Sequence, residues 1–541
     1  MASSDTDKEV SSSTTPELNA DFDWRTLPNA LDNGPWYKNE GLRKLYWITS
    51  VVYMGQFLNG YDGTILGSLL ALDRWNHDLG YPDANQIGYL NAMSYIAGFI
   101  SGPIASWAAD KYGRKFCMQY YAVTMMIGTI LGCIAGIPQL EGKGLALFCV
   151  SKFIIGSGLA TALMTMQILL QEISHPRQRP IVAGAFNQSW TLGHVLSAWL
   201  SFATSHRKDS WQWRVPYLVQ AGFAVYMSIG IFMMPESPRF LASKGRFDEA
   251  RAWLVKYHGN GNPDDELVKF EYQEMLAGMA QDEKAKGARW RNLLKSKPNR
   301  QRMWLAAMFT MIPQWSGGAI INFYYTRILT SVGVTGAATQ TGIGAGLSMW
   351  GWCVQVASYF VMARVKRRTH MLCTWPFLIA FNVAVTVASA MYAKDGSQAA
   401  GIAAVFFVWM YSGADQFVTG IFYSYTGEIM SYELRAKGLA VWTLVNQATG
   451  CFNAYVNSIA LSEIGWRYYL VYTGLLVIWF GLLYYFMVET YGKTLEEMEI
   501  IFLGEKSAVA KLDAQLEAGA SLDGVDVAQV TAAGEKDKAS I

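Results

Sequence analysis

The sequence predicts an all-α membrane protein of twelve transmembrane helices, arranged as two six-helix halves joined by a helical linker. The 541-residue chain is 52% apolar and only 16% charged, which is too apolar for an ordinary soluble protein of this length. Long apolar runs fall into two groups of six, with a polar stretch between the groups. Charged signatures also recur from one group to the other at a nearly constant offset. These three observations together indicate an internally duplicated membrane bundle.

Three charged signatures carry the evidence for duplication. They are EISHPRQR (172–179) with EIMSYELR (428–435), PESPR (235–239) with VETYGKT (488–494), and DKYGRK (110–115) with ARVKRR (363–368). The offsets are 256, 253 and 253 residues. Parallel halves of this kind are found in secondary transporters.

Twelve apolar runs are each long enough to cross about 30 Å of hydrocarbon, which takes roughly 20 helical residues. They lie near 46–71, 86–108, 116–136, 144–170, 181–203 and 215–234, and then near 303–328, 338–362, 370–392, 399–425, 437–461 and 467–487. The two halves therefore extend over 46–234 and 303–487.

The polar segments outside the halves predict tails and a linker. Residues 1–45 are expected to form a disordered tail, 235–302 a linker of short amphipathic helices, and 488–541 a second tail. The linker carries fourteen Lys and Arg, and the loops 109–115, 176–180 and 364–368 are also basic. Cationic residues are retained on the cytoplasmic side, so both termini and the linker are expected to face the cytoplasm.

Four sequence motifs resemble those of a known family. PESPRFL, DKYGRK, GEIMSYELRAKG and VETYGKTLEEME resemble the signatures of the sugar porter family of the major facilitator superfamily, over residues 46–502. Details such as NGYDG at Asn59 and PQWSGG at Pro313 resemble the fungal lactose-permease-like and hexose transporter branch. The resemblance implies the major facilitator fold, with a central cavity that opens alternately to each side of the membrane. We expect the protein to be a multi-pass protein of the plasma membrane.

Asp62 and Lys152 are the foremost functional candidates, because ionisable side chains inside a membrane are costly and usually functional. Asp62 lies nine residues before the outer end of the first apolar run, and Lys152 lies eight after the outer start of the fourth. At 1.5 Å per residue both sit roughly 12 to 14 Å below the surface, so they can pair. The resemblance implies a proton-accepting acid and its cationic partner, although the family's usual cation is Arg. The alternative is a structural pair that never titrates during transport.

Charged residues at helix ends form a second candidate set. We expect them to interlock across the two halves and hold the inner side closed while the cavity faces outward. They are Asp110, Arg114, Glu172, Arg179, Glu236, Glu428 and Arg435. The second DKYGRK-like loop has Ala363 and Lys366 in place of its acid and glycine, so its lock should be weaker or supported from elsewhere.

A sugar needs amides or hydroxyls for its hydroxyl groups and aromatic rings for its C–H faces. The candidates for this role, placed by the family's motifs, are Asn187, Gln188, Gln314, Trp315, Asn322, Tyr324, Asp415, Tyr423 and Asn446. Each can alternatively be a residue that joins membrane helices by hydrogen bonds.

Departures from the family pattern bear on the substrate. Gly318 stands where the branch normally has Asn, and Gln447 stands where many sugar porters have Trp. Asp415 and His194 are unusual polar residues within apolar runs, and each has a structural alternative. An ionised Asp415 in the cavity would disfavour anions and favour neutral polyols or glycosides.

Other functional classes lack support in the sequence. The six cysteines lie in apolar runs without a CxxC pair, and the six histidines are scattered, so neither disulfides nor a metal centre are indicated. We find no nucleophile, base and orienting group for an enzyme, and expect no cofactor and no nucleic-acid partner. The function predicted is proton-coupled symport of a neutral mono- or disaccharide by a monomer in the lipid bilayer. The alternatives are a facilitative sugar or polyol uniporter and a sugar sensor that does not transport.

Overall fold

The computed structural model describes residues 27–29, 36–137, 142–286, 290–362, 364–430, 435–493, 498 and 501–502. The side chains of Asn322, Tyr423 and Arg435 lie outside the described part, so the predictions made for these three residues are not taken further. The predicted tails also lie largely outside it. Within the described residues the regular secondary structure is helical.

The first half is built from six long helices. They are α1 (Glu40–Leu69), α3 (Ala84–Tyr112), α4 (Arg114–Ile134), α5 (Gly144–Ile173), α6 (Arg179–Thr204) and α7 (Trp211–Met233). Short helices lie between or before them: η3 (Trp36–Lys38), α2 (Asp73–Asp78) and η5 (Pro176–Gln178). The first helix begins at Glu40, six residues before its apolar run, so the end of the segment expected to be disordered is helical. Asn39 explains this start, because its side chain accepts a hydrogen bond from the Leu42 backbone N–H as an N-cap.

The second half repeats the arrangement with one interruption. Its helices are α12 (Lys297–Trp315), α13 (Gly318–Ser331), α14 (Ala337–Met362), α15 (Arg367–Asp395), α16 (Gln398–Ile429), α17 (Arg435–Ile464), η7 (Gly465–Arg467) and α18 (Tyr468–Phe486). The seventh apolar run, predicted as one helix over 303–328, is two helices. Gly317 breaks it with a left-handed φ of 108°, a conformation that suits glycine.

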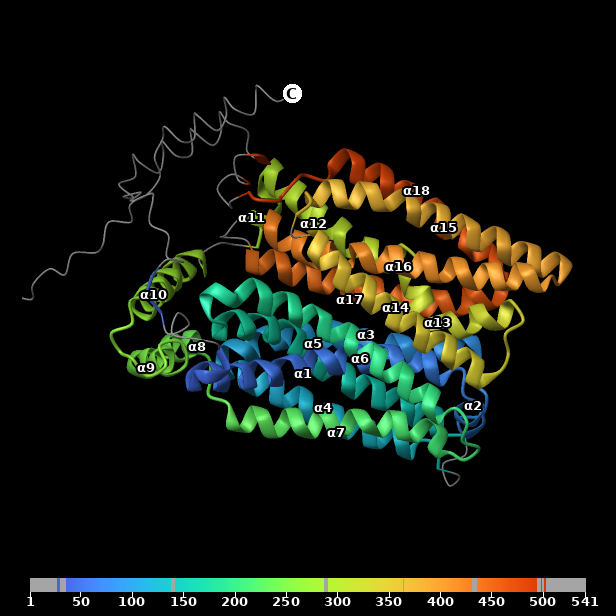
Figure 1. Ribbon diagram of the computed structural model, residues 1–541, viewed down its shortest axis with the longest axis horizontal. Coiled ribbons are helices and arrows are strands. Elements are labelled where there is room, and N and C mark those ends of the chain that lie inside the picture. Colours follow the sequence, from blue (N-terminus) through green and yellow to red (C-terminus); the bar gives the residue numbers. More distant parts are fainter. Residues whose placement is uncertain are drawn as a thin grey trace, which may run out of the picture.

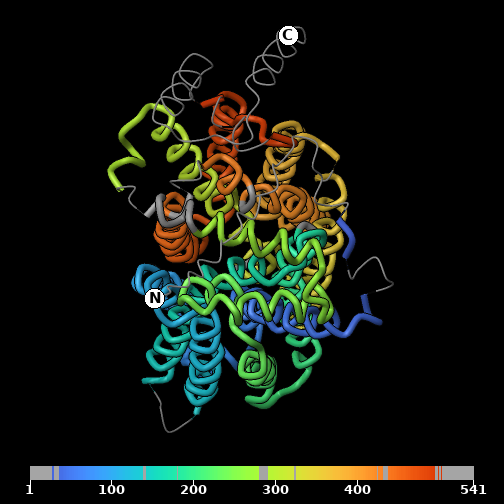
Figure 2. The backbone as a smooth tube through the Cα atoms, turned by 90° about the vertical axis from the view of Figure 1, so that its left-hand side faces the viewer, coloured from blue at the N-terminus to red at the C-terminus, as the bar shows by residue number. Residues whose placement is uncertain are grey.

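The two halves lie side by side, with their helices running along the long axis of the molecule (Figure 1). Seen end-on, the blue-to-green first half and the yellow-to-red second half form separate groups (Figure 2). Where they meet, α3 packs along α17, α6 along α14 and α13 against α1. The halves are therefore joined mainly through these three helix pairs.

The linker forms helices beyond one end of the bundle (Figure 1). Three are short, as expected: α8 (Pro238–Ser243), α9 (Phe247–Tyr257) and α11 (Asn292–Lys295), but α10 (Glu266–Lys286) has 21 residues. We call this end the linker end and the opposite end, where α2 lies, the far end. The α12 helix begins at Lys297, so the linker is slightly shorter than the predicted 235–302.

Among the residues that the structure describes, six stretches are long and apolar enough to cross a membrane by length and composition: α4, α5, α7, α15, α16 and residues 437–486, which include most of α17 and all of α18. Helices such as α1, α6 and α14 contain more glycine and polar residues. These are the helices that meet the other half, so they are shielded from lipid on that side.

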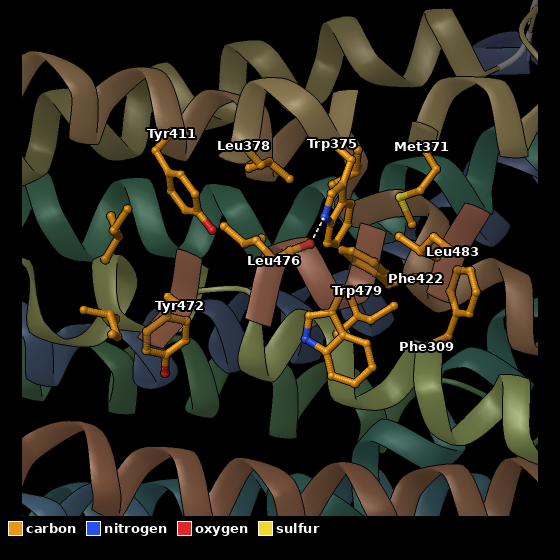
Figure 3. Packing of buried hydrophobic residues seen from close by; sticks show 14 of the residues in the cluster. Phe309, Met371, Trp375, Leu378, Tyr411, Phe422, Tyr472, Leu476, Trp479 and Leu483 are labelled. Atoms are coloured by element: carbon orange, nitrogen blue, oxygen red, sulfur yellow. Dashed lines mark hydrogen bonds between the residues drawn. The ribbon is translucent and has the colours of Figure 1, made fainter. Parts of the chain in front are cut away.

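Aromatic side chains fill the core of the second half. Trp375 of α15 is fully buried and donates its indole N–H to the Leu476 carbonyl of α18, at 2.9 Å (Figure 3). Phe309 of α12 stacks on Tyr425 of α16 with ring centroids 4.0 Å apart. These contacts fix α12, α15, α16 and α18 around one core.

Candidate functional site

Asp62 of α1 and Lys152 of α5 form an ion pair inside the first half. The Lys152 Nζ lies 2.8 Å from Asp62 Oδ1, and both residues are at most 4% exposed. Lys152 Nζ also lies 5.6 Å from the centre of the Tyr217 ring of α7. The pairing expected from helix depth is therefore present, and it links the first and fourth long helices.

Close helix packing places Asp62 in this position. A methyl group on Gly60 would lie 1.7 Å from the Trp190 carbonyl oxygen, and one on Gly193 would lie 2.0 Å from the Phe57 carbonyl oxygen. The α1 and α6 backbones thus touch through these two glycines, and Gly60 is only two residues from Asp62.

Several predicted sugar-binding residues gather near the break in the seventh membrane segment. Gln314 Nε2 donates to Asn446 Oδ1 of α17 at 3.2 Å, and Asn453 donates to the Gln314 carbonyl at 2.7 Å. Trp315 packs edge-on against Phe452, with ring centroids 6.0 Å apart. Its indole N–H is buried and has no hydrogen-bond partner among the described residues, so it remains available as a donor.

Gln188 and Asn187 lie half-buried on α6, toward the second half. Gln188 Nε2 donates to the Gln355 carbonyl of α14 at 3.4 Å, while its Oε1 is buried and unpartnered within the described part of the chain. Thr191 donates to the Gln355 side-chain oxygen. Sequence reasoning missed Gln355 and Thr191. The only sequence signal was that Gln355 is a glutamine within an apolar run. Its partner Thr191 lies 164 residues away, so sequence spacing does not connect them.

Tyr324 joins the halves near the far end. It accepts a hydrogen bond from Asn91 of α3 at 2.9 Å and donates to the Ala454 carbonyl of α17 at 2.6 Å. The next residue, Tyr325, donates to the Ser68 hydroxyl of α1 at 3.4 Å, and Ser458 donates to the Ala84 carbonyl at 2.6 Å. These hydrogen bonds hold the halves together at the far end.

Asp415 lies in the middle of α16, directly over the break between α12 and α13. A methyl group on Gly318 would lie 2.3 Å from Asp415 Oδ2, so the carboxylate occupies the space that a side chain at position 318 would need. A cavity of about 20 Å³ adjoins this break, lined by Gly317, Tyr411 and Tyr472 among others. It has room for about one water and not for a sugar. His194, the other unusual polar residue, packs edge-on against Trp190 with ring centroids 6.1 Å apart.

The charged residues at the linker end pair within a half or with the linker. Arg114 pairs with Glu172 at 3.0 Å in the first half, and Arg367 pairs with Glu428 at 3.6 Å in the second. Arg179 reaches Glu271 of the linker helix α10 at 2.9 Å. The pairs described here therefore differ from the expected interlock across the halves, which stays a prediction for a state that opens at the far end.

The repeated loops make matching contacts in the two halves. Glu236 accepts the Lys115 backbone N–H at 3.3 Å, and Glu489 accepts those of Arg367 and Arg368 at 2.9 and 3.0 Å. Burial raises the pKa of the Glu236 carboxyl. The second loop thus keeps this hydrogen bonding of a glutamate to backbone N–H groups, which we call the glutamate brace, although the loop lacks the acid and glycine of the first. The distance between Arg367 and Glu428 in the second half is 3.6 Å, against 3.0 Å between Arg114 and Glu172 in the first. The weaker or otherwise supported lock expected at this loop stays a prediction.

Asp110 takes part through its backbone. Its carbonyl, near the end of α3, accepts a hydrogen bond from Lys244 Nζ of the linker at 3.1 Å. A cation at the C-terminal end of a helix is favourable. The Asp110 carboxylate itself is exposed.

A buried histidine pair attaches the linker to the bundle. His258 of the linker lies 2.6 Å from Glu271 and 3.1 Å from the Ile173 carbonyl at the end of α5. His175 lies 5.2 Å from His258, ring to ring, and contacts the Asn29 side chain at 3.1 Å. Burial lowers the pKa of His175 to about 3, so its ring is neutral. Sequence reasoning did not identify this cluster.

The two matched halves, the membrane-crossing helices and the buried ion pair define a membrane transporter of the major facilitator type. A model of the sugar (and other) transporter family matches residues 48–502. The chain belongs to that family, which confirms the predicted fold class and the sugar-transport function.

Curated relatives and solved structures agree with this assignment. The chain is 24% identical over 499 residues to a high-affinity glucose transporter of Kluyveromyces lactis, covering 88% of each chain. It is 27% identical over 481 residues to the high-affinity hexose transporter HXT6 of Saccharomyces cerevisiae, covering 84% of this chain and 80% of the other. Its fold is similar to the inward-open xylose transporter XylE of E. coli, with a TM-score of 0.70 at 17% identity, covering 84% and 99%.

Proposed function

We propose that this protein is a proton-coupled symporter that moves a neutral mono- or disaccharide across a membrane by alternating access. The observation that carries the proposal is the buried pair of Asp62 and Lys152, 2.8 Å apart between α1 and α5. A charge inside a membrane is costly, so such a pair is a functional candidate. The coupling ion is a proton, and no other cofactor is part of the proposal.

Asp62 is the proton-binding group of the cycle. Protonation of its carboxylate removes the charge that holds Lys152, which frees α1 to move relative to α5. Sugar binding then favours the rearranged state, and release of the proton restores the pair. The cycle thus uses one ion pair to tie protonation to helix movement.

The substrate site is proposed at the break between α12 and α13 and the facing side of α6. Gln188 offers a buried acceptor and Trp315 a buried donor, both without partners among the described residues. These groups suit the hydroxyls of a neutral sugar, and Gln314 and Asn446 add amides to the same region. The names of the relatives, a glucose and a hexose transporter, support a sugar of this size.

We place the linker end in the cytoplasm because the linker carries fourteen Lys and Arg. Both termini then face the cytoplasm, and the far end faces outward. We further propose that the protein acts as a monomer in the plasma membrane, and that it has no enzymatic activity and binds no nucleic acid.

Uptake by a host that lacks its own sugar transporters tests the proposal. Labelled glucose, xylose, lactose, cellobiose and a polyol are supplied at acidic and neutral pH, with and without a protonophore. We expect uptake of at least one sugar, and we expect the protonophore and Asp62→Asn each to abolish its accumulation. Uptake that survives both would favour a uniporter in which the pair is structural. Sugar binding without uptake would favour a sensor.

A further inference from the structure

Asp415 is an ionisable residue in the membrane-spanning part that the proposed cycle does not use. It lies in α16, is 9% exposed, and belongs to the half that lacks the Asp62–Lys152 pair. Its carboxylate fills the space beside Gly318, at the first residue of α13. The position is specific, because any side chain at 318 would collide with it.

The broken membrane segment needs partners at both of its inner ends. The end of α12 leaves carbonyl groups without helical partners, and the start of α13 leaves free N–H groups and a partial positive charge. Such groups are costly inside a membrane unless protein satisfies them. Tyr411 of α16 donates to the Ser316 carbonyl at the end of α12. One turn further along α16, the Asp415 carboxylate lies beside Gly318, the first residue of α13.

The α13 helix is also the piece of the second half that reaches α1. Tyr325 contacts Ser68 of α1, and Tyr324, which lies at a kink with φ −129° and ψ 17°, contacts Asn91 of α3. The start of α13 therefore lies beside Asp415 of α16, while Tyr324 and Tyr325 in its middle contact the first half at the far end.

We propose that Asp415 is a positioning residue whose charge holds the N-terminus of α13, and through α13 keeps the far end of the transporter closed. Removing the charge frees α13 to tilt about Gly317 and Gly318. The contacts of Tyr324 and Tyr325 with the first half are then lost more often. The inference rests on alternating access but does not depend on which solute is carried.

The accessibility of Ser68 to a thiol reagent tests this role in purified protein in detergent. Ser68 is 3% exposed beneath Tyr325. It is replaced by cysteine in a variant whose six native cysteines are replaced by serine or alanine, and the labelling rate is measured without sugar. We expect Asp415→Asn, which keeps the shape and removes the charge, to raise the rate on the order of tenfold.

Glycine variants provide a second, independent test in the same labelling experiment. Gly318→Ala should raise the labelling rate similarly, because its methyl group displaces the carboxylate. Gly474→Ala in α18 is the matched control, since a methyl group there meets no atom within 4 Å. Combining Gly318→Ala with Asp415→Ser should give the rate of Asp415→Ser alone, because the displaced group is already absent.

Three results would overturn the inference. Unchanged labelling in Asp415→Asn would show that the charge does not hold α13. A changed KM for sugar with unchanged labelling would make Asp415 a substrate contact instead. A rise in Gly474→Ala equal to that in Gly318→Ala would make the effect unspecific. Failure of wild-type protein to transport any sugar would contradict the proposed function but leave this measurement intact.

Discussion

At the scale of single residues, a buried charge is stabilised only by its partner. Asp62 and Lys152 are both almost fully buried, so removal of one leaves an uncompensated charge in a poorly polar environment. The exposed pair of Lys269 and Asp264 has a similar distance of 3.0 Å but is surrounded by water. The two pairs therefore differ in what they contribute to stability.

We predict that Lys152→Met destabilises the purified protein by about 3 to 5 kcal/mol. Lys269→Met, the matched control, should change stability by less than about 1 kcal/mol. The double variant Asp62→Asn/Lys152→Met should recover most of the loss, because it removes both charges. Denaturant titration in mild detergent measures all three. Equal effects of Lys152→Met and Lys269→Met would contradict this account of the pair.

The neutral His175 ring predicts a pH dependence of stability. Its folded-state pKa of about 3 lies below the ordinary value of 6.5, so the unfolded chain binds more protons between these values. Stability is therefore lost as pH falls below 6.5, by about 2 kcal/mol at pH 5. His175→Gln should remove this part of the dependence, while His206→Gln, an exposed control, should keep it. Unfolding midpoints at pH 7.5 and pH 5 provide the comparison, and identical slopes in the two variants would contradict it.

At the scale of helices, glycine spacing decides how closely two backbones approach. Gly60 and Gly63 both lie in the NGYDG motif of α1, only three residues apart. A methyl group on Gly60 would overlap the Trp190 carbonyl, whereas one on Gly63 meets no atom within 4 Å. Only the first glycine faces α6.

We predict that Gly60→Ala lowers stability by at least about 1 to 3 kcal/mol, because α1 must move away from α6. It should also impair transport, since Asp62 moves with α1. Gly63→Ala is the control on the same helix and should leave both properties nearly unchanged. Thermal unfolding and uptake assays measure the two effects. An equally stable Gly60→Ala variant would show that α1 and α6 do not need this close contact.

The glutamate braces predict a local effect at the linker end. Glu489 holds the backbone N–H groups of Arg367 and Arg368, which begin α15. Glu489→Ala should expose the preceding loop and speed tryptic cleavage after Arg364 or Lys366 several-fold. Glu463→Ala, on an exposed residue near the far end of α17, should not. Cleavage rates followed by mass spectrometry distinguish the two, and equal rates would argue against the brace.

At the scale of the whole molecule, the sequence predicted the fold closely because apolar run length and repeated signatures report helices and duplication directly. The helix bounds differ from the runs by a few residues at most ends, since capping residues such as Asn39 extend helices into polar sequence. The break at Gly317 was missed because PQWSGG interrupts the run without ending its apolar character.

The candidate site was predictable only in part. Asp62 and Lys152 stand out because charges are rare in apolar runs, and helix depth suggested their pairing. Arg179 pairs with Glu271 of the linker, and Gln188 contacts Gln355 of α14. Such contacts depend on how distant helices pack together. The partners have no characteristic spacing along the chain, so the sequence alone does not reveal them.

The coupling of protons to sugar is the central claim, and proton flux measures it most directly. Purified protein is reconstituted in vesicles that contain a pH-sensitive dye, and the transported sugar is added outside. The account predicts internal acidification in step with sugar entry in the wild type, and sugar exchange without acidification in Asp62→Asn. Sugar entry into wild-type vesicles with no change of internal pH would contradict it.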